Sequence, residues 1–247
     1  MAETRVIAPR VGTDIVRSIF MGVRTRRSGA YTIGVDSGAL VGADDGTDTM
    51  SLGTNLTIDG STVGVDGLDT GTLSDDTWYA IWLIKEPNGL VHGLLSTSFS
   101  SPVLPGGYTM KRRIGSTYYD DDAGYFQKYE QIGQRITWED EKLLYSSGNM
   151  PTGTWINLSL TSSAPPTVGL GYFMSHGPYT ASNLYISYDG AGLHFMSCGG
   201  NDGEDRNRGD GFAAIILTYQ HVYIYRSGHG NENPVTIWIS GYEDKLY

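Results

Sequence analysis

The sequence predicts an all-β protein: a jelly-roll-type antiparallel β-sandwich preceded by an N-terminal attachment arm. Glycine occupies 34 of the 247 positions, about twice the usual share, and together with proline it leaves almost no room for long helices. Aromatic residues reach 11%, with 17 tyrosines, which favours strands and argues against a disordered chain. Beyond Thr77, short apolar runs separated by turn residues recur at the intervals of a sandwich.

These runs define the expected strands. They cover residues 78–84, 90–98, 108–117, 125–138, 142–146, 155–161, 167–174, 184–188, 193–198, 212–226 and 235–240, after shorter pieces at 31–35, 50–52 and 56–58. Run 78–84 is apolar on both faces, which predicts a central strand. In run 155–161, Ile156, Leu158 and Leu160 alternate with polar residues, as in a strand with one wet face.

The last two runs allow a prediction of register. We expect residues 222–226 and 235–239 to form an antiparallel hairpin in which Tyr223 faces Trp238. One face then carries His221, Tyr223, Tyr225, Thr236, Trp238 and Ser240, and the core face carries Val222, Ile224, Val235, Ile237 and Ile239.

Composition divides the chain into three parts. Residues 1–27 form a basic docking arm, residues 28–76 a lead-in of short strands rich in Gly and Asp, and residues 77–247 the jelly-roll sandwich. A short amphipathic helix is expected behind a Thr13 cap, and it would be marginal alone. Docking on a partner and packing on its own domain both remain open. The expected docking residues are Arg5, Arg10, Arg17, Ile19, Phe20, Arg24, Arg26 and Arg27.

The charge distribution separates this arm from the rest. The arm holds six arginines and two acidic residues, in a chain whose formal net charge is −10. An acidic body repels phosphate backbones, so nucleic acid is not an expected partner of the body. A contact of the arm with nucleic acid or an anionic surface stays open.

Cysteine content and hydropathy suggest where the protein works. Cys198 is the only cysteine, so no intrachain disulfide is expected, and Cys198 reads as a small buried apolar residue. No secretory signal or membrane-spanning run is apparent. We therefore expect synthesis in the bacterial cytoplasm without a signal peptide, no membrane insertion, and release inside a particle.

A series of short motifs carries a family resemblance. In order they are Gly67-Leu-Asp-Thr-Gly, Thr77-Trp-Tyr, Leu94-Leu-Ser, Leu104-Pro-Gly-Gly-Tyr and Arg112-Arg-Ile-Gly. This order, over residues 67–131, resembles a module of tailed-phage and prophage structural proteins, including tail-fibre-like and head-spike-like surface proteins. The closing run from Ile237 to Glu243 resembles the last strand of such modules.

The resemblance implies a multimeric β-sandwich displayed on a virion or on a virion-like gene-transfer particle. We expect the protein to be a homotrimer and to meet other particle proteins through the arm. It supplies no catalytic motif, and the glycines and aromatic residues of the motifs also suit turns and core packing.

Metal and catalytic patterns are weak. The acidic runs 120–122 and 201–210 suit solvated turns or calcium, but neither has the spacing of a calcium loop. The tripeptide Arg208-Gly-Asp is short enough to occur by chance. Five histidines show no zinc spacing, so neither a metal nor another cofactor is predicted.

A polysaccharide depolymerase would need a pair of carboxylates across the sugar. No nucleophile motif appears, so a non-enzyme is expected.

Carbohydrate binding is the expected activity, because sugars need exposed aromatic rings beside hydrogen-bonding side chains. Several loops and one strand face offer this combination. The candidate binding residues are Tyr118, Tyr119, Asp120, Tyr125, His176, Tyr179, Asn201, Asp202, Tyr223, His229, Asn231 and Trp238, with Asn183 beside Tyr179.

The sequence thus predicts a non-enzymatic surface spike or fibre protein that binds a host surface glycan and aids attachment. Two alternatives stay open. One is a decoration or connector protein that recognises no host, and the other is a polysaccharide depolymerase.

Overall fold

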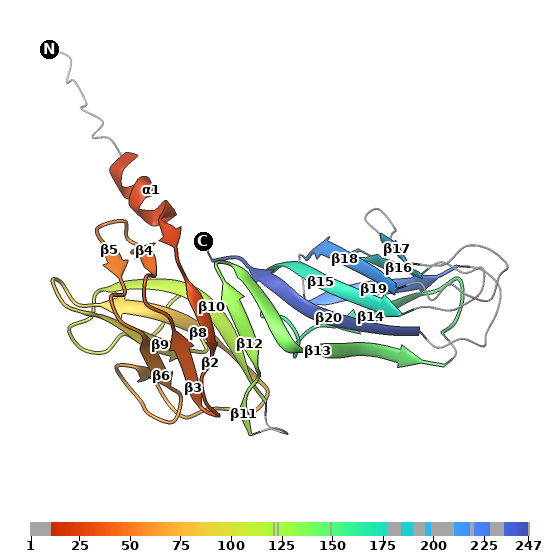
Figure 1. The fold of residues 1–247 in the computed structure, drawn as a ribbon, viewed down its shortest axis with the longest axis horizontal. Coiled ribbons are helices and arrows are strands. Elements are labelled where there is room, and N and C mark those ends of the chain that lie inside the picture. Colours follow the sequence, from red (N-terminus) through yellow and green to blue (C-terminus); the bar gives the residue numbers. More distant parts are fainter. Residues whose placement is uncertain are drawn as a thin grey trace, which may run out of the picture. The chain divides into compact units, whose positions relative to one another are not determined.

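The computed structural model describes residues 11–120, 122, 124–148, 150–176, 184–189, 196–198, 210–217, 220–227 and 235–246 (Figure 1). These residues form one α-helix and twenty β-strands, which confirms the all-β class. The chain divides into two compact units. Unit 1 is Met1–Ser74 with Tyr79–Gly115, and unit 2 is Asp75–Trp78 with Ser116–Tyr247.

Unit 1 is built from short strands around one long buried strand (Figure 1). Its elements are α1 (Val11–Ser18), β1 (Phe20–Met21), β2 (Arg24–Arg27), β3 (Thr32–Val35), β4 (Leu40–Gly42), β5 (Thr49–Ser51), β6 (Leu56–Asp59), β7 (Gly67–Leu68), β9 (Val91–Ser96) and most of β8 (Thr77–Lys85) and β10 (Met110–Asp120). Strands β1, β4 and β5 are neighbours, as are β2, β3 and β6, and β10, β8, β9 and β7.

Strand β8 is the central strand that its sequence predicts. It lies between β10 and β9, and every residue from Trp78 to Ile84 is buried. On one face of it, Phe99, Leu104 and Tyr108 pack against a buried cluster formed by Ala80, Trp82, Ile84 and Leu94. An apolar residue at every position suits a strand covered on both faces.

The expected arm 1–27 is not separate from the lead-in that follows it. Strand β2 pairs with β3, and Val23 and Thr25 are buried while Arg24 and Arg26 are exposed. The charge pattern masks this strand in the sequence, because three of its four residues are arginines, of which Arg24 and Arg26 lie on the outer face and Arg27 is half-buried. Helix α1 begins at Val11, two residues before the expected cap, and packs on β4 of its own unit.

Helix α1 meets β4 backbone to backbone. The Gly42 amide donates a hydrogen bond to the Ile19 carbonyl at 2.9 Å. A Cβ at Gly42 would lie 1.6 Å from the Val16 carbonyl oxygen, so only glycine permits this approach. Ile15 faces outward and is 59% exposed, whereas Val16 and Ile19 are half-buried.

Unit 2 contains the jelly roll (Figure 1, green to blue). Its strands are β13 (Arg135–Ser147), β14 (Trp155–Ser159), β15 (Val168–His176), β16 (Leu184–Ser187), β17 (Met196–Cys198), β18 (Asp210–Ile216), β19 (His221–Arg226) and β20 (Val235–Asp244). One sheet has the order β13-β20-β15-β18 and the other β14-β19-β16-β17, with every pair antiparallel. Eight strands in this order make a jelly roll. It begins at Arg135 rather than at residue 77.

Further strands precede the jelly roll. Strand β12 (Tyr129–Ile132) pairs with β13, and β11 (Tyr125–Phe126) pairs with the end of β10. Strand β13 runs without a break from Arg135 to Ser147, through the gap expected at residues 139–141. A register shift against β20 between Thr137 and Lys142 absorbs these charged residues as a bulge.

The unit 2 core lies between the two sheets and extends into an aromatic cluster. Its sheet residues are Leu158, Phe173, Leu184, Ile186, Val222, Ile224, Val235, Ile237 and Ile239, all buried. The rings of Trp78, Tyr118 and Tyr242 pack together with centroids 5.1 and 5.8 Å from that of Trp78. The Nε1 of Trp78 donates to the Thr161 carbonyl at 2.6 Å, so the buried indole keeps a hydrogen bond.

The predicted hairpin of residues 222–226 and 235–239 does not form. Strand β19 pairs with β14 and β16, whereas β20 pairs with β13 and β15. Run 212–226 likewise divides into β18 and β19, which belong to different sheets. The core-face assignments are nevertheless confirmed. Alternation along a strand fixes which face is buried, but a jelly roll sends most successive strands to opposite sheets, so nearness in sequence does not give the partner.

The glycine contact of α1 can be tested by adding one methyl group. We expect Gly42→Ala to displace α1 and to lower the free energy of unfolding by about 1–3 kcal/mol, as for other overpacked sites. Limited trypsin digestion should then cut faster after Arg17. Gly53→Ala is the control, because its Cβ would meet nothing within 4 Å. Equal cutting of the two variants would contradict the contact.

Candidate carbohydrate-binding face

Two of the predicted sugar-binding tyrosines are buried. Tyr118 is 4% exposed and Tyr119 is 9% exposed. The Tyr118 hydroxyl donates to Asp76 at 3.0 Å, and burial together with this carboxylate raises the pKa of Tyr118. Their rings therefore cannot offer open faces to a ligand. From the sequence, these rings are expected to be exposed. In the structure both faces of β10 are covered along most of the strand, so consecutive residues are buried.

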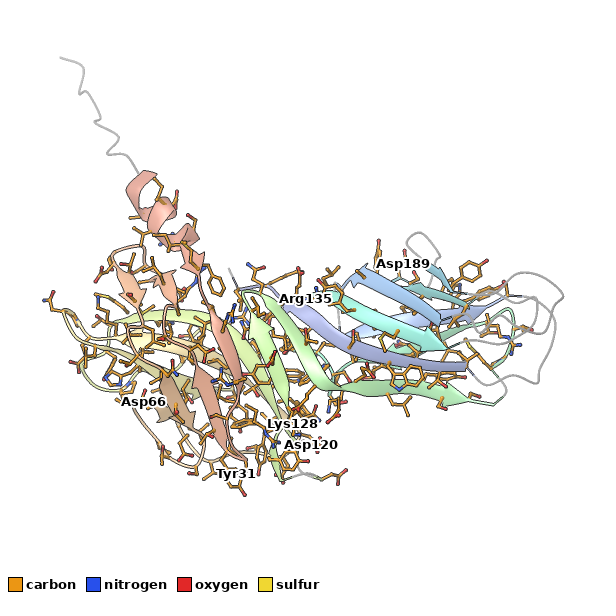
Figure 2. All side chains as sticks on the ribbon, viewed as in Figure 1. Tyr31, Asp66, Asp120, Lys128, Arg135 and Asp189 are labelled. Atoms are coloured by element: carbon orange, nitrogen blue, oxygen red, sulfur yellow. The ribbon has the colours of Figure 1, made fainter. Side chains whose placement is uncertain are left out.

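Asp120 and Tyr125 do lie together at the end of β10. They are register partners in the β10–β11 ladder, and Tyr125 is 39% exposed. Asp120 accepts a hydrogen bond from the Gln127 amide (Figure 2). This gives one exposed ring beside one carboxylate.

The remaining loop predictions lie mostly outside the described residues. Those outside are Tyr179, Asn183, Asn201, Asp202, His229 and Asn231. The acidic run 201–210 is described only at Asp210, in β18. His176 ends β15, where its backbone lies opposite Asp210 and Thr236.

The predicted pair of Tyr223 and Trp238 is separated, since the two residues belong to different sheets. Trp238 lies in the outer row of its sheet between Leu143 and Met174, without a polar neighbour in that row. On the same sheet, the Arg135 guanidinium lies 4.4 Å from the Tyr172 ring centroid (Figure 2). That outer face also carries Tyr172, Thr236 and Ser240, each half-buried like Trp238, but the Tyr223 expected beside Trp238 lies on the other sheet.

The predicted docking residues lie on unit 1, apart from Arg5 and Arg10, which fall outside the described part. Arg17 lies in the last turn of α1 and is exposed, with its guanidinium 3.9 Å from Asp14. Arg24 is exposed, Arg26 pairs with Asp36, and Arg27 is half-buried. Ile19 and Phe20 are half-buried, and the Arg112 guanidinium lies 6.0 Å from the Phe20 ring.

A different surface gathers rings and polar groups: the outer face of the sheet β14-β19-β16. Period-two alternation puts the residues of one parity on this face and those of the other parity in the core. We call it the aromatic face. Its residues are Trp155, Asn157 and Ser159 from β14, His221, Tyr223 and Tyr225 from β19, and Tyr185 and Ser187 from β16.

Three rings form a row across three strands. Trp155 is the register partner of Tyr225, and Tyr225 is that of Tyr185. The Trp155 and Tyr225 ring centroids are 5.0 Å apart at 37°, and those of Tyr225 and Tyr185 are 5.9 Å apart at 48°. Each residue is half-buried, so the rings support one another and still reach solvent.

Polar groups border this row along the strands. Asn157 is exposed and lies opposite Tyr223, and exposed Ser159 lies opposite His221. The His221 ring meets the Tyr223 ring edge to face, with centroids 5.3 Å apart. Beyond β16, Asp189 accepts a hydrogen bond from Ser187 at 2.7 Å (Figure 2). The aromatic face thus combines flat apolar surface with hydroxyl, amide and imidazole groups.

Sequence reasoning found only Tyr223 of this face as a binding residue. It placed His221 and Tyr225 beside Tyr223 but omitted Trp155 and Tyr185. The signal was the alternation itself, since Trp155-Ile-Asn-Leu-Ser and Leu184-Tyr-Ile-Ser each put polar or aromatic residues at every second position. What the sequence lacked was the pairing that brings three separate runs together.

Unit 1 contains one oriented histidine outside this face. His92 Nδ1 lies 2.9 Å from Asp66 Oδ2, and the Gly93 amide donates to the other Asp66 oxygen at 2.8 Å (Figure 2). Burial, then Glu86 and Asp66, raises the pKa of the neighbouring Tyr108. A carboxylate-held imidazole resembles part of an acid–base pair. Here Asp66 also holds the β9 backbone, which gives the contact a structural role.

Within the described ranges, no three His, Cys, Asp or Glu side chains are grouped to hold a metal ion. The helix that the structure describes is too short to cross a membrane. No protein-family model matches this chain, and no curated protein matches it either. The likeness of residues 67–131 to phage surface proteins therefore stays a prediction.

Two substitutions on β14 test whether the aromatic face is surface rather than core. We expect Leu158→Ala, on the buried side, to lower the free energy of unfolding by about 2–5 kcal/mol. Trp155→Ala should cost only about 0.5–1.5 kcal/mol, the value of an aromatic pair. Denaturant unfolding followed by circular dichroism measures both. A Trp155 loss as large as that of Leu158 would show that the ring belongs to the core.

Proposed function

We propose that this chain is a non-enzymatic surface spike or fibre protein of a phage or phage-like particle, and that its aromatic face binds host cell-surface polysaccharide. The observation that carries the proposal is the row Trp155, Tyr225 and Tyr185, which crosses three paired strands with polar groups alongside.

The chemistry of sugars matches this surface. A pyranose ring has an apolar C–H face that packs on an aromatic ring, and hydroxyl edges that need donors and acceptors. Asn157 and Ser159 supply such groups from exposed positions on β14. Because each ring sits on a strand paired on at least one side, binding orders few side chains and loses little conformational entropy.

Two arguments support the proposal that the chain belongs to a phage-like particle. Residues 67–131 resemble phage surface proteins, and a particle carries many copies of a weak binding site. A shallow open face binds a single chain segment weakly. Many copies on one particle, as homotrimers, convert weak sites into firm attachment. We propose that the protein is made in the bacterial cytoplasm and displayed on the particle surface, with host glycan as its external partner.

Attachment to the other particle proteins is proposed at the N-terminal segment through α1. Ile15 is 59% exposed and Arg17 is exposed on this helix, while α1 itself is held by β4. The proposed docking segment does not include β2, because β2 is paired with β3 within unit 1 and serves its fold.

The binding face is tested by removing its central ring. We expect Tyr225→Ala to weaken binding to host envelope polysaccharide by about tenfold or more, near 1.4 kcal/mol. Glycan arrays and calorimetry with the full chain measure this. Tyr31→Ala is the matched control, since Tyr31 is a 44% exposed tyrosine of unit 1 (Figure 2).

The rival functions give different results in the same assays. Equal binding by the wild type and the Tyr225→Ala chain would contradict the aromatic face. Release of reducing ends from the polysaccharide would identify a depolymerase instead. Particles that lack the chain and fall apart, yet attach normally while intact, would identify a decoration protein.

A further inference from the structure

We infer that the aromatic face accepts neutral polysaccharides and rejects anionic ones, an inference that rests on the proposed function. It goes beyond that function by naming the chemical class of the ligand. Two independent observations carry it: the side chains on the face and the distribution of charge between the units.

Among the described residues, those that form the aromatic face include no lysine or arginine to pair with an acidic sugar. Its strands β14, β16 and β19 contain a single such residue, Arg226, which has the core-side parity and is 0% exposed. Its Nη1 donates to the Met150 carbonyl at 3.3 Å, so its charge is used inside the unit. Carboxylate and sulfate groups are recognised by charged donors, above all arginine. An anionic sugar would lose its hydration here without a cation in return.

Charge across the molecule adds long-range repulsion. Unit 1 holds ten Lys and Arg and ten Asp and Glu, so its formal charge is zero. Unit 2 holds seven basic and seventeen acidic residues, so it carries the whole net charge of −10. Such a field lowers the local concentration of polyanions and slows their association. The unit that contains the aromatic face is therefore the unit that repels acidic polymers.

The residues of the face suit a neutral sugar for the same reason. Indole and phenol rings pack on C–H surfaces, and amide and hydroxyl groups exchange hydrogen bonds with sugar hydroxyls at no cost of burying charge. Asn157 lies opposite Tyr223 and two residues along β14 from Trp155, where a ligand on the ring row would meet it.

The test compares neutral and anionic polymers on the full chain. Immobilised dextran, mannan and galactan are the neutral probes, and alginate, polygalacturonate and polysialic acid the anionic ones. We expect binding to at least one neutral polymer, with affinity changing less than about twofold from 0.01 M to 1 M salt, over which the screening length falls from about 30 Å to about 3 Å. Anionic polymers should not bind at low salt.

A charge placed on the face supplies the positive control. Asn157→Lys should gain binding to the anionic polymers at low salt and lose it at high salt, whereas Asn157→Gln should not. Failure of Asn157→Lys to gain any anionic binding would overturn the claim that missing cations exclude these ligands.

The remaining outcomes separate this inference from the proposed function. An anionic polymer that binds the wild-type chain in preference to all neutral ones, and is lost in Tyr225→Ala, overturns the neutral class but keeps the aromatic face as a binding site. If no polymer binds, or if Tyr225→Ala binds as the wild type does, both the inference and the proposed function are overturned.

Discussion

The two-residue repeat of an extended chain governs unit 2. Each jelly-roll strand must bury one side against the opposite sheet, and the pleat sends the other side to the opposite face. On β19 this separates Val222 and Ile224, which are buried, from Tyr223 and Tyr225, which are half-buried. The requirement for a core therefore creates a second surface whose residues are free of core packing. The aromatic face is the side that folding leaves to solvent.

Hydrogen bonding across the ladder turns this periodicity into a site. Trp155 and Tyr225 are far apart in sequence, yet their strands share a register that places the rings side by side. A ring next to a ring loses less freedom on binding than an isolated side chain does. The same ladder brings Asn157 beside Tyr223, so rings and polar groups are positioned by the backbone rather than by loops.

Features that depend on residues close in the sequence were predicted correctly, and features that depend on distant residues were not. Composition and the spacing of apolar runs predicted the all-β class, the jelly roll and the central strand β8, and local alternation predicted the buried sides of β19 and β20. It failed where a partner had to be chosen. The last two strands were paired with each other, although each pairs within its own sheet. Exposed loops were likewise favoured over strand faces, and this hid Trp155 and Tyr185. Tyr118 and Tyr119 were misjudged because covering of both faces of β10 depends on distant residues.

The contact between helix α1 and β4 affects which residues can change during evolution. The closest approach of α1 to β4 involves the Gly42 backbone and the Val16 carbonyl, with no side chain between them. Contacts of this kind constrain the residue on the strand and leave most of the helix sequence unconstrained. During divergence, the outward positions of α1 can change to match a new assembly partner while the helix keeps its place. Gly42 cannot change in the same way, because a side chain at this position would displace the helix.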